Sequence, residues 1–334
     1  MKSGVVALAG VVALALMGPA QAETIKVGLS KLASYPATPI AIERGYFKAQ
    51  GIDAEMVFFD SAQPIAVAVT SGDIDFGISG LSAGFYTLAG QGQLRLLAGS
   101  SGEQPGFYNL VFLESIKAFE GGLKEAKNLP GHSIGVTQVG TSLHYSAGLV
   151  ADKYNFDFKS LNMKPLQSNS NVISALTGGT IDVGILPATP ALPLIQKGTI
   201  KVLGWVGDLA PGWTGSAAFT STKTANDRSD LVKRFLLAYR HGTQDYHDAF
   251  TGPGEKRQNG PTAPAMLTLL SNFTGVSTED LDRATPYLDA QGRLDSTDIG
   301  RQITWYASQG LMKGEVKADQ LIDSRYAIPL HAGK

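Results

Sequence analysis

The sequence predicts an α/β protein of two similar lobes, each a doubly wound, mainly parallel sheet flanked by helices. Apolar, β-branched runs alternate with helical patterns up to about Lys223, which is typical of parallel sheets. An internal repeat is the second observation, because residues 68–78 and 175–185 are identical at seven of eleven positions, an offset of 107. The same offset places Gly28 on Gly135, so one unit of strands and helices occurs twice.

Proline and glycine mark the helix boundaries of the first unit. Pro36 or Pro39 begins a helix that runs through residue 44, because the missing N–H of proline costs no hydrogen bond in a first turn. Gly72 ends the next helix, since glycine readily adopts the left-handed conformation found at helix ends. The predicted elements are strands at 24–29, 54–59 and 74–78 and helices at 36–44 and 61–69.

The second unit repeats this order, and the chain beyond it is predicted to be mostly helical. Leu231, Phe235 and Tyr239 form part of an apolar stripe at helical spacing, and Ser277 and Asp280 have the spacing of a capping box. The predicted elements are strands at 132–137, 163–166 and 181–185 and helices at 142–153, 172–176, 229–250, 264–273 and 299–308.

Two short extended stretches, 110–113 and about 217–222, are predicted to be hinge strands that join the lobes. They divide the chain into lobe 1, residues 23–111 plus 222–334, and lobe 2, residues 112–221. The C-terminal helices are expected to return and pack on lobe 1.

Residues 1–22 have the pattern of a secretory signal peptide. Lys2 precedes an uncharged apolar run, and the segment ends with small residues around Gln21. Cleavage is expected after Ala22, which gives an exported, periplasmic protein that begins at Glu23. Gly, Pro or a charged residue interrupts every later apolar run, so no transmembrane helix is expected.

Composition excludes several classes of function. Lys and Arg total 28 and Asp and Glu total 29, a balance that does not favour nucleic-acid binding. The absence of cysteine excludes disulfides, thiolate metal sites and cysteine nucleophiles. Five histidines without metal-ligand spacing give no metal site, so no metal and no cofactor is expected. Nothing in the sequence indicates an oligomer, and a monomer is predicted.

Ligand-binding residues are predicted where the parallel strands of both lobes end. Ligands of open parallel sheets bind beyond the carboxyl ends of the strands, where helix N-termini present free N–H groups. Such groups, with hydroxyls beside them, suit a small anion. The predicted ligand-binding residues are Ser30, Tyr35, Gly80, Ser82, Gly140, Thr141, Ser142, His144, Pro187 and Thr189, with Trp213 as an apolar wall.

Several of these side chains also have an ordinary structural interpretation. Ser30, Ser82, Thr141 and Ser142 could serve as helix N-caps, and His144 and Trp213 could be packed residues of the core.

Three further motifs suggest chemistry that the sequence does not complete. Residues 80–84 match G-x-S-x-G around Ser82, the nucleophile elbow of hydrolases, but the matching Asp and His are not evident. Residues 135–142 resemble a P-loop with Thr141 in place of the required lysine. Asp75 and Asp182 recur at the repeat offset, and we expect both to accept hydrogen bonds from backbone amides of turns rather than to act in catalysis.

Taken together, these segments identify a resemblance to the periplasmic substrate-binding proteins of ABC importers, in the nitrate, sulfonate and taurine branch, which also includes thiamine-precursor proteins. The segments that carry it are residues 41–53, 70–77, 115–116 with 129–136, 140–142 and 175–182. The resemblance implies the periplasmic-binding-protein fold, whose two lobes close on a hinge around a ligand. It also implies ligand-lining roles for Ser30, Tyr35, Ser82, Thr141, Ser142 and Pro187.

The function expected is that of a high-affinity extracytoplasmic receptor for a small organic anion, a carboxylate or a sulfonate and possibly an aromatic one. Such a receptor hands its solute to an ABC permease in the inner membrane, driven by a cytoplasmic ATPase. No enzymatic activity is expected, because the cysteine-rich motif of the related thiamine-precursor synthases is absent. An exported serine hydrolase using Ser82 and a sensory solute receptor remain as alternatives.

Overall fold

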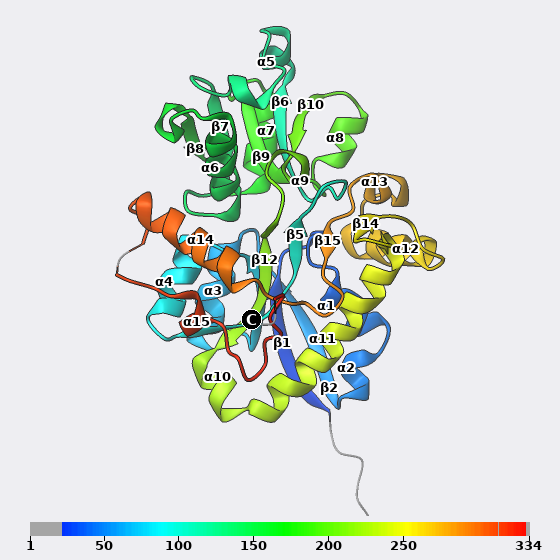
Figure 1. Cartoon of the computed structure of the whole chain (residues 1–334). Coiled ribbons are helices and arrows are strands. Elements are labelled where there is room, and N and C mark those ends of the chain that lie inside the picture. The colour runs from blue at the N-terminus through cyan, green and yellow to red at the C-terminus, as the bar shows by residue number, and fades with distance from the viewer. Residues whose placement is uncertain (1–21, 313, 332–334) are drawn as a thin grey trace, which may run out of the picture.

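The computed structural model describes residues 22–312 and 314–331 and shows two lobes stacked one above the other (Figure 1). The predicted signal peptide, residues 1–22, lies outside the described residues except for Ala22. Over the described part of the chain, no helix combines the length and the apolar character that crossing a bilayer would require.

The sheet of lobe 1 has five strands in the order β2-β1-β3-β12-β4. β1 pairs in parallel with both β2 and β3, whereas β12 runs antiparallel between β3 and β4. The sheet is therefore parallel apart from one strand, which the chain contributes after it has returned from lobe 2. The strands are β1 (Glu23–Leu29), β2 (Ile52–Phe58), β3 (Phe76–Gly80), β4 (Leu94–Gly99) and β12 (Ser216–Ser221).

The sheet of lobe 2 repeats this arrangement in the order β10-β6-β9-β7-β8. Here the antiparallel strand is β6, which pairs with β9 and β10. Gly28 lies opposite Gly77 in lobe 1, and Gly135 lies opposite Gly184 in lobe 2, so the repeat offset of 107 extends to strand register. The predicted fold of two duplicated α/β units is confirmed. The strands are β6 (Leu110–Ser115), β7 (Ser133–Val136), β8 (Asn162–Pro165), β9 (Val183–Pro187) and β10 (Ile200–Trp205).

The repeated aspartates hold equivalent positions in the two sheets. Asp75 accepts a hydrogen bond from the Lys26 N–H (2.8 Å), and Asp182 accepts one from the Ser133 N–H (2.9 Å). The predicted structural role is confirmed, with one correction. The amides belong to β1 and β7, the neighbouring strands, and not to the turn before each aspartate.

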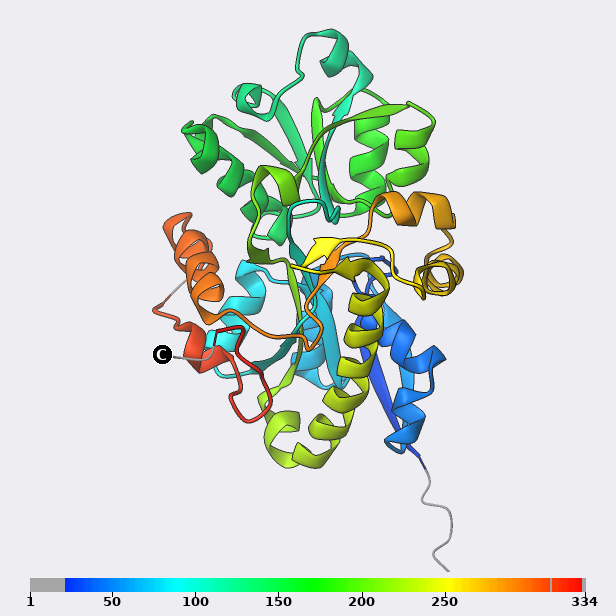
Figure 2. The ribbon, with the colours of Figure 1, turned by 45° about the vertical axis from the view of Figure 1, so that its right-hand side comes forward.

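Helices cover both faces of the sheet in lobe 1. The long helix α11 packs against α1 and α2 and buries Leu231, Phe235 and Tyr239, as its apolar stripe predicts (Figure 2). Phe235 stacks on Phe76 of the sheet, with ring centroids 3.8 Å apart. The helices are α1 (Ala37–Glu43), α2 (Tyr46–Ala49), α3 (Ala62–Ser71), α4 (Ala83–Gly90), α10 (Thr222–Asp227), α11 (Ser229–Phe250), α12 (Ala263–Thr274) and α15 (Ala318–Leu321).

The longest helix of lobe 2, α6, has 13 residues against 22 in α11, and two helices from the C-terminal part of the chain contact this lobe. α13 packs on α8, and α14 packs on both α4 of lobe 1 and α6 of lobe 2, so the C-terminal segment contacts both lobes. The remaining helices are α5 (Ile116–Glu120), η1 (Ala126–Asn128), α6 (Ser142–Tyr154), η2 (Phe158–Ser160), α7 (Asn169–Thr177), α8 (Leu192–Gln196), α9 (Val206–Leu209), α13 (Thr278–Arg283) and α14 (Ser296–Ser308).

The strands that connect the lobes differ from the predicted ones. Residues 110–113 and 217–222 were expected as hinge strands. They are extended apart from Thr222, which begins α10. However, they lie inside the two large sheets as parts of β6 and β12. The chain passes between the lobes just before each of them, through β5 (Ser101–Glu103) and β11 (Trp213–Thr214). These two strands and β15 (Tyr287–Leu288) form a small sheet in the order β11-β5-β15.

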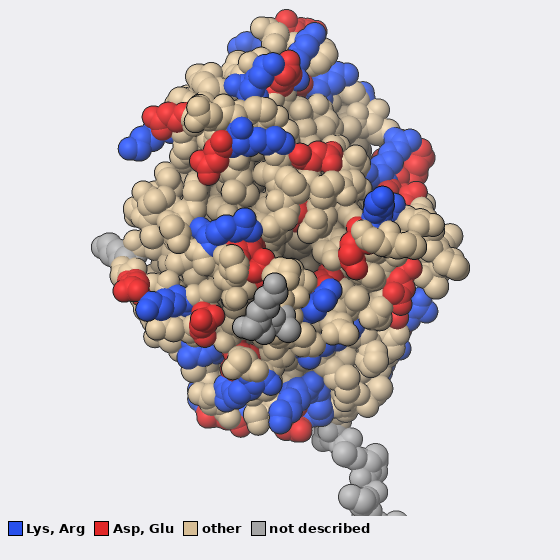
Figure 3. Space-filling view, in the orientation of Figure 1, with Lys and Arg blue, Asp and Glu red and all other residues tan. Residues whose placement is uncertain are grey.

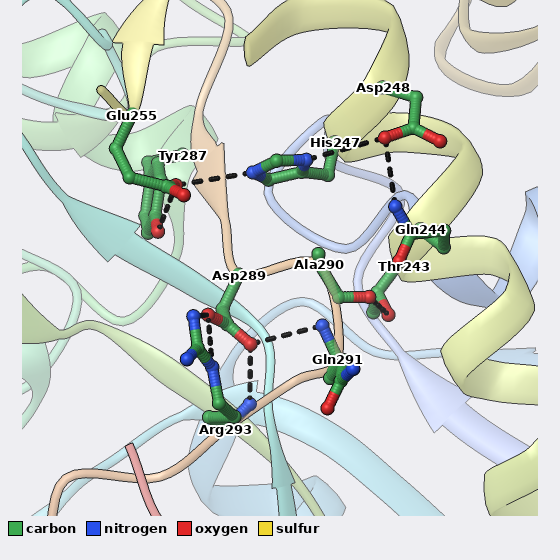
Figure 4. A network of polar contacts seen from close by, with 10 residues as sticks. All are labelled: Thr243, Gln244, His247, Asp248, Glu255, Tyr287, Asp289, Ala290, Gln291 and Arg293. Carbon is green, nitrogen blue, oxygen red and sulfur yellow. Dashed lines mark hydrogen bonds and ion pairs between the residues drawn. The ribbon is translucent and has the colours of Figure 1, made fainter. Parts of the chain in front are cut away.

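A polar network anchors this connecting sheet to lobe 1 (Figure 4). The Tyr287 hydroxyl donates to Glu255 (2.8 Å), which also lies 3.1 Å from Nε2 of His247 on α11. Asp289 accepts hydrogen bonds from the Arg293 guanidinium, one of them at 2.8 Å, and these partners hold the pKa of Asp289 below its usual value. Glu255 lies beside the hairpin of β13 (Thr251–Gly252) and β14 (Lys256–Arg257) that follows α11.

Candidate functional site

A cavity of about 50 Å³ lies between the lobes, where the carboxyl ends of the parallel strands face each other. Its lining comes from three sources: the loops of lobe 1, the loops of lobe 2, and the segments that pass between them. Six of the predicted residues line it, namely Ser30, Tyr35, Gly80, Thr141, Ser142 and Pro187.

Three other predicted residues lie close by but serve the contact between the lobes or cap a helix. The Thr189 hydroxyl of lobe 2 accepts a hydrogen bond from the Ala33 N–H of lobe 1 (3.0 Å). The Gly140 carbonyl accepts one from the Ala83 N–H (2.8 Å), again between lobes. Ser82 is the N-cap of α4, since its Oγ accepts a hydrogen bond from the Phe85 N–H. None of the three is part of the cavity lining.

His144 and Trp213 lie in an aromatic cluster and do not line the cavity. His144 packs edge-on against Trp305 of α14, and its Nδ1 accepts a hydrogen bond from the Gly140 N–H. Burial lowers the pKa of His144 to about 4, so the ring is neutral at physiological pH. Trp213 packs edge-on against Tyr145 of α6 and donates its indole N–H to the Ala210 carbonyl. Both residues have the structural role that the sequence left open.

The lobes are closed on one another in this structure. The two hydrogen bonds between the lobes described above are one sign of this. In addition, Gly80 of lobe 1 lies directly against Ser142 of lobe 2. A Cβ atom at Gly80 would lie 2.7 Å from the Ser142 Oγ, closer than real Cβ atoms approach. An alanine at position 80 would therefore require the Ser142 hydroxyl to move for this approach of the lobes.

Helix α6 presents its N-terminus to the cavity without a side-chain cap. Its N-cap, Thr141, is extended, but the Thr141 hydroxyl donates to the Gln138 carbonyl and not to the helix. The first-turn N–H groups therefore lack the partner that Ser82 provides to α4. No acidic residue lies in the first turn of α6.

Buried hydroxyl groups line the same part of the cavity. Ser30, Thr137 and Ser142 are 8%, 5% and 9% exposed, and their side chains form no hydrogen bond with other described residues. Because these residues line the cavity and their hydroxyls have no partner among the described residues, the hydroxyls are available to a polar ligand or to water.

The wall beside the connecting strands is a hydrogen-bonded network around Asn109. The Ser34 hydroxyl donates to Asn109 Oδ1 (2.6 Å), and Asn109 Nδ2 donates to Oε1 of Glu103 (2.8 Å). Glu103 is fully buried on β5, and burial raises the pKa of its carboxyl to about 8. Ser101 and Ser216 complete the wall, with their Oγ atoms 2.8 Å apart.

The cavity lining contains one charged residue, the carboxylate Asp60, and no Lys, Arg or His. The Tyr35 hydroxyl accepts a hydrogen bond from the Gly80 N–H, and burial raises the pKa of Tyr35 to about 12, so it is neutral. Among the described residues, no group of His, Asp and Glu side chains has the arrangement of a metal site. On the outer surface, Lys and Arg are interspersed with Asp and Glu over the face in Figure 3.

Several residues of the lining were not predicted from the sequence. Asp60, Ser61 and Asn169 follow β2 and β8, and the rule applied to the other strand ends would have found them. Asn109 lies between β5 and β6 and Ser216 begins β12, so neither follows the carboxyl end of a parallel strand. The other missed residues with polar side chains are Ser34, Ser101 and Thr137.

Comparison with known proteins identifies one family. The model of the NMT1/THI5-like family matches residues 37–249. A protein of Brucella abortus, provisionally described as a binding protein, is 30% identical over 245 residues, which are 69% of each chain.

Solved structures share the fold at low sequence identity. The alkanesulfonate-binding protein SsuA from Xanthomonas axonopodis, bound to MOPS, has a TM-score of 0.72 and 16% identity, covering 90% of this chain and 98% of SsuA. The periplasmic nitrate-binding protein NrtA from Synechocystis has a TM-score of 0.68 and 14% identity, covering 88% of this chain and 83% of NrtA. The desulfurization enzyme DszB is more distant, with a TM-score of 0.59 and 16% identity over 92% of this chain and 97% of DszB.

The matched segment includes α1, most of the two repeated units and nearly all of α11, and the overall fold is that of periplasmic binding proteins. This chain belongs to the NMT1/THI5-like family.

Proposed function

We propose that this chain is an extracytoplasmic solute receptor that binds a small organic anion, a carboxylate or a sulfonate, between its lobes. The receptor delivers the anion to an ABC permease with a cytoplasmic ATPase, and it reaches the periplasm after cleavage of the signal peptide behind Ala22. One observation carries the proposal: the uncapped N-terminus of α6 lies at the cavity between the lobes, beside hydroxyls that have no partner among the described residues.

The N-terminus of α6 supplies the attraction for the acidic group. Each contact of an anion with a helix N-terminus contributes about 0.3–1 kcal/mol when exposed, and up to about 2 kcal/mol in a partly buried geometry. Hydrogen bonds from Ser30, Thr137 and Ser142 would add to this. Several such contacts together are consistent with tight binding without a basic side chain.

The size and lining of the cavity favour a small aliphatic ligand over an aromatic one. The cavity volume is about 50 Å³, and Tyr35 is the one aromatic residue that lines it within the described part of the chain. Trp213, expected as an apolar wall, packs on Tyr145.

A ligand that contacts both lobes would favour the closed state of the protein. A ligand favours the closed state only through contacts that it makes there and not in the open state. Residues of lobe 1 such as Ser30 and of lobe 2 such as Ser142 line one cavity, so a bound anion would link them.

The alternative of a serine hydrolase at Ser82 has little support. The Ser82 Oγ caps α4, and no hydrogen bond joins it to a histidine among the described residues. A sensory receptor would use the same closed form, and the genes beside this one would distinguish that role from transport.

The proposal is tested by removing one N–H group of α6. Ser142→Pro deletes the first N–H of the helix, while proline fits the first helical position and Thr141 already has the extended backbone that a following proline requires. Mature protein from Glu23 onward is screened by thermal shift and calorimetry against short carboxylates and sulfonates.

We expect a saturable rise in melting temperature for the wild type and a loss of affinity of about tenfold or more for Ser142→Pro. Thr278→Pro is the matched control, because it alters the first position of α13, where Ser277 is also extended. The proposal is wrong if no anion binds while an ester is hydrolysed and Ser82→Ala abolishes the turnover.

A further inference from the structure

We infer that Glu103 controls anion binding from behind the cavity wall: the protein binds its anion tightly only while the Glu103 carboxyl is protonated, so anion binding and proton binding are coupled. The inference rests on the proposed function and goes further, because it assigns a residue outside the cavity lining as the one that makes affinity depend on pH.

Glu103 lies directly behind residues that line the cavity. Ser101, on the same face of β5 two residues earlier, is part of the lining. Asn109, also in the lining, donates its side-chain N–H to Oε1 of Glu103 (2.8 Å). A Cβ atom at Gly215, a third lining residue, would lie 3.9 Å from the same oxygen. One layer of residues therefore separates the carboxyl from a bound ligand.

No positive charge lies beside this carboxyl to balance an ionised form. Glu103 is fully buried, and its two donors, the Asn109 amide and the Leu110 N–H, are neutral and leave Oε2 without a partner among the described residues. It forms no ion pair with a described residue, and no described Lys, Arg or His lines the cavity. An ionised Glu103 would be a buried charge without a counterion, and burial accordingly raises its pKa to about 8.

The elements packed against β5 supply no charge either. β11, β12 and residues 104–109 contain no charged residue, and the titratable side chain of β15, Tyr287, donates its hydroxyl to a carboxylate. In the described lining, Asp60 is the one charged residue and Tyr35 is neutral. Charged side chains beyond these elements have partners of their own: Asp208 with the Gly106 N–H, Asp298 with Arg301, Asp289 with Arg293, and Glu255 with His247 (Figure 4). The ionisation of Glu103 therefore responds to what the cavity holds.

An anion in the cavity and an ionised Glu103 repel each other. At the effective dielectric constant of a protein interior, two like charges separated by one layer of residues weaken binding by about tenfold or more. Protonation of Glu103 removes this repulsion, and by linkage the bound anion raises the pKa of Glu103 further. The proton comes from solvent and converts the carboxylate to a carboxyl group, and no other bond changes.

Affinity for an anion should therefore fall with rising pH. Well below pH 8, Glu103 is protonated in both the free and the ligand-bound protein, so affinity is constant and binding takes up no proton. At pH 8 about half of the free protein is ionised at Glu103, and binding takes up about half a proton. At higher pH the affinity falls, by at most about tenfold per pH unit.

Calorimetry on the mature protein from Glu23 onward measures both quantities. The probes are acetate, propanoate, methanesulfonate and ethanesulfonate, which stay ionised from pH 6 to 9.5. Affinities at pH 6, 7, 8 and 9.5 give the pH profile. Binding heats at pH 8 in Tris and in bis-Tris propane, which differ in ionisation enthalpy and carry no acidic group that would compete, give the number of protons taken up.

The proteins are the wild type, Glu103→Gln and Glu114→Gln. Glu103→Gln keeps a side-chain oxygen for Asn109 and cannot ionise. Glu114→Gln is the matched control, because Glu114 is 2% exposed, its Oε2 also lacks a partner among the described residues, and burial also raises its pKa. It lies at the other end of β6 from Leu110, which lines the cavity.

We expect the wild type and Glu114→Gln to bind at least one probe with an affinity that is constant between pH 6 and 7 and about tenfold or more weaker at pH 9.5. Both should take up about half a proton at pH 8. Glu103→Gln should bind with the same affinity at every pH and take up no proton.

A wild-type affinity that stays constant to pH 9.5, or a fall that persists in Glu103→Gln, overturns the inference and leaves the proposed anion receptor in place. An affinity that rises with pH also overturns it, because Glu103 would then attract a positive group of the ligand. If no probe binds at pH 6, where Glu103 is uncharged, the proposed function is wrong and the inference falls with it. The proton count of the wild type needs no variant, so the test holds even if Glu103→Gln does not fold.

Discussion

Glu103 is a buried carboxyl group on β5, one of the two strands that connect the lobes. Its Oε1 accepts a hydrogen bond from Asn109, which lines the cavity, and its Oε2 has no partner among the described residues. Burial raises its pKa from 4.5 to about 8, so the group is mainly protonated in the folded protein at pH 7. In the unfolded chain it is ionised at that pH.

Glu103 therefore makes folding stability depend on pH with a definite sign. Its contribution is complete below pH 4.5, falls by at most about 1.4 kcal/mol per pH unit as pH rises toward 8, and is lost above that. Glu103→Gln keeps a side-chain oxygen for Asn109 but cannot ionise. We expect the variant to gain stability relative to the wild type as pH rises from 5 to 8.

Urea unfolding at pH 5, 6.5 and 8 measures this difference. Glu55→Gln, at an exposed position on β2, is the control and should track the wild type. A difference between Glu103→Gln and the wild type that stays constant over this range would show that Glu103 ionises normally.

At the scale of residues, the positions of the candidate ligand-binding residues could be predicted from the sequence better than their roles. Ser30 and Ser142 follow strand ends and do line the cavity, because the end of a strand fixes where the next residue lies. His144 follows the same strand as Ser142, but its ring packs on Trp305. That partner is supplied by α14, and no local pattern in the sequence indicates it.

At the scale of elements, α6 and α14 meet through an unusually close contact at Gly148. A Cβ atom at Gly148 would lie 2.3 Å from Cζ2 of Trp305, so the glycine leaves room for the indole. Trp305 also packs edge-on against His144, Tyr145 and Phe158, which joins α14 to lobe 2. Glycine in a helix interior costs about 1 kcal/mol relative to alanine, and here the contact with Trp305 offsets that cost.

The effect of Gly148→Ala on folding stability should change sign when Trp305 is replaced by alanine. In the wild type, the added methyl group clashes with the indole, and we expect a loss of about 1–3 kcal/mol of stability. In Trp305→Ala the space is open, and the same substitution should stabilise by up to about 1 kcal/mol through helix propensity. Trp305→Ala alone should cost about 3 kcal/mol or more, since the indole contacts several rings.

A double-mutant cycle by denaturant unfolding measures this coupling. Ser146→Ala, in the same helix, serves for comparison: Ser146 is buried, and among the described residues its hydroxyl bonds only to the Leu143 carbonyl. Equal effects of Gly148→Ala in both backgrounds would mean that Trp305 does not contact α6 as described.

At the scale of the whole molecule, the repeat predicted the two lobes but not how the chain joins them. Gly28 and Gly135 occupy equivalent places because each lies against an isoleucine at the same offset, Ile74 and Ile181. This packing occurs between residues of the same unit, so it is visible as sequence similarity between the two units. The connecting strand β5 pairs with β11 on one side and with β15, from much later in the chain, on the other, so its partners cannot be found locally.

Closure of the whole molecule depends on the small size of residue 80. Gly80→Ala would place a methyl group 2.7 Å from the Ser142 Oγ, and this clash exists only when the lobes approach each other. The position lies in β3, and its backbone is not in the left-handed region, so alanine is compatible with the folded lobe. We therefore expect Gly80→Ala to leave folding stability nearly unchanged while it disfavours the closed form and weakens ligand binding by about tenfold or more.

Small-angle scattering with saturating ligand tests whether the defect is one of closure. The wild type should become more compact on binding, and Gly80→Ala should remain extended. Adding Ser142→Ala removes the Oγ atom and leaves the Ser142 Cβ at 3.6 Å, an ordinary contact distance, so the double variant should regain compactness. Affinity should recover less than compactness, because the Ser142 hydroxyl is also a proposed ligand contact. If Gly80→Ala closes as fully as the wild type, then Gly80 and Ser142 do not limit the approach of the lobes.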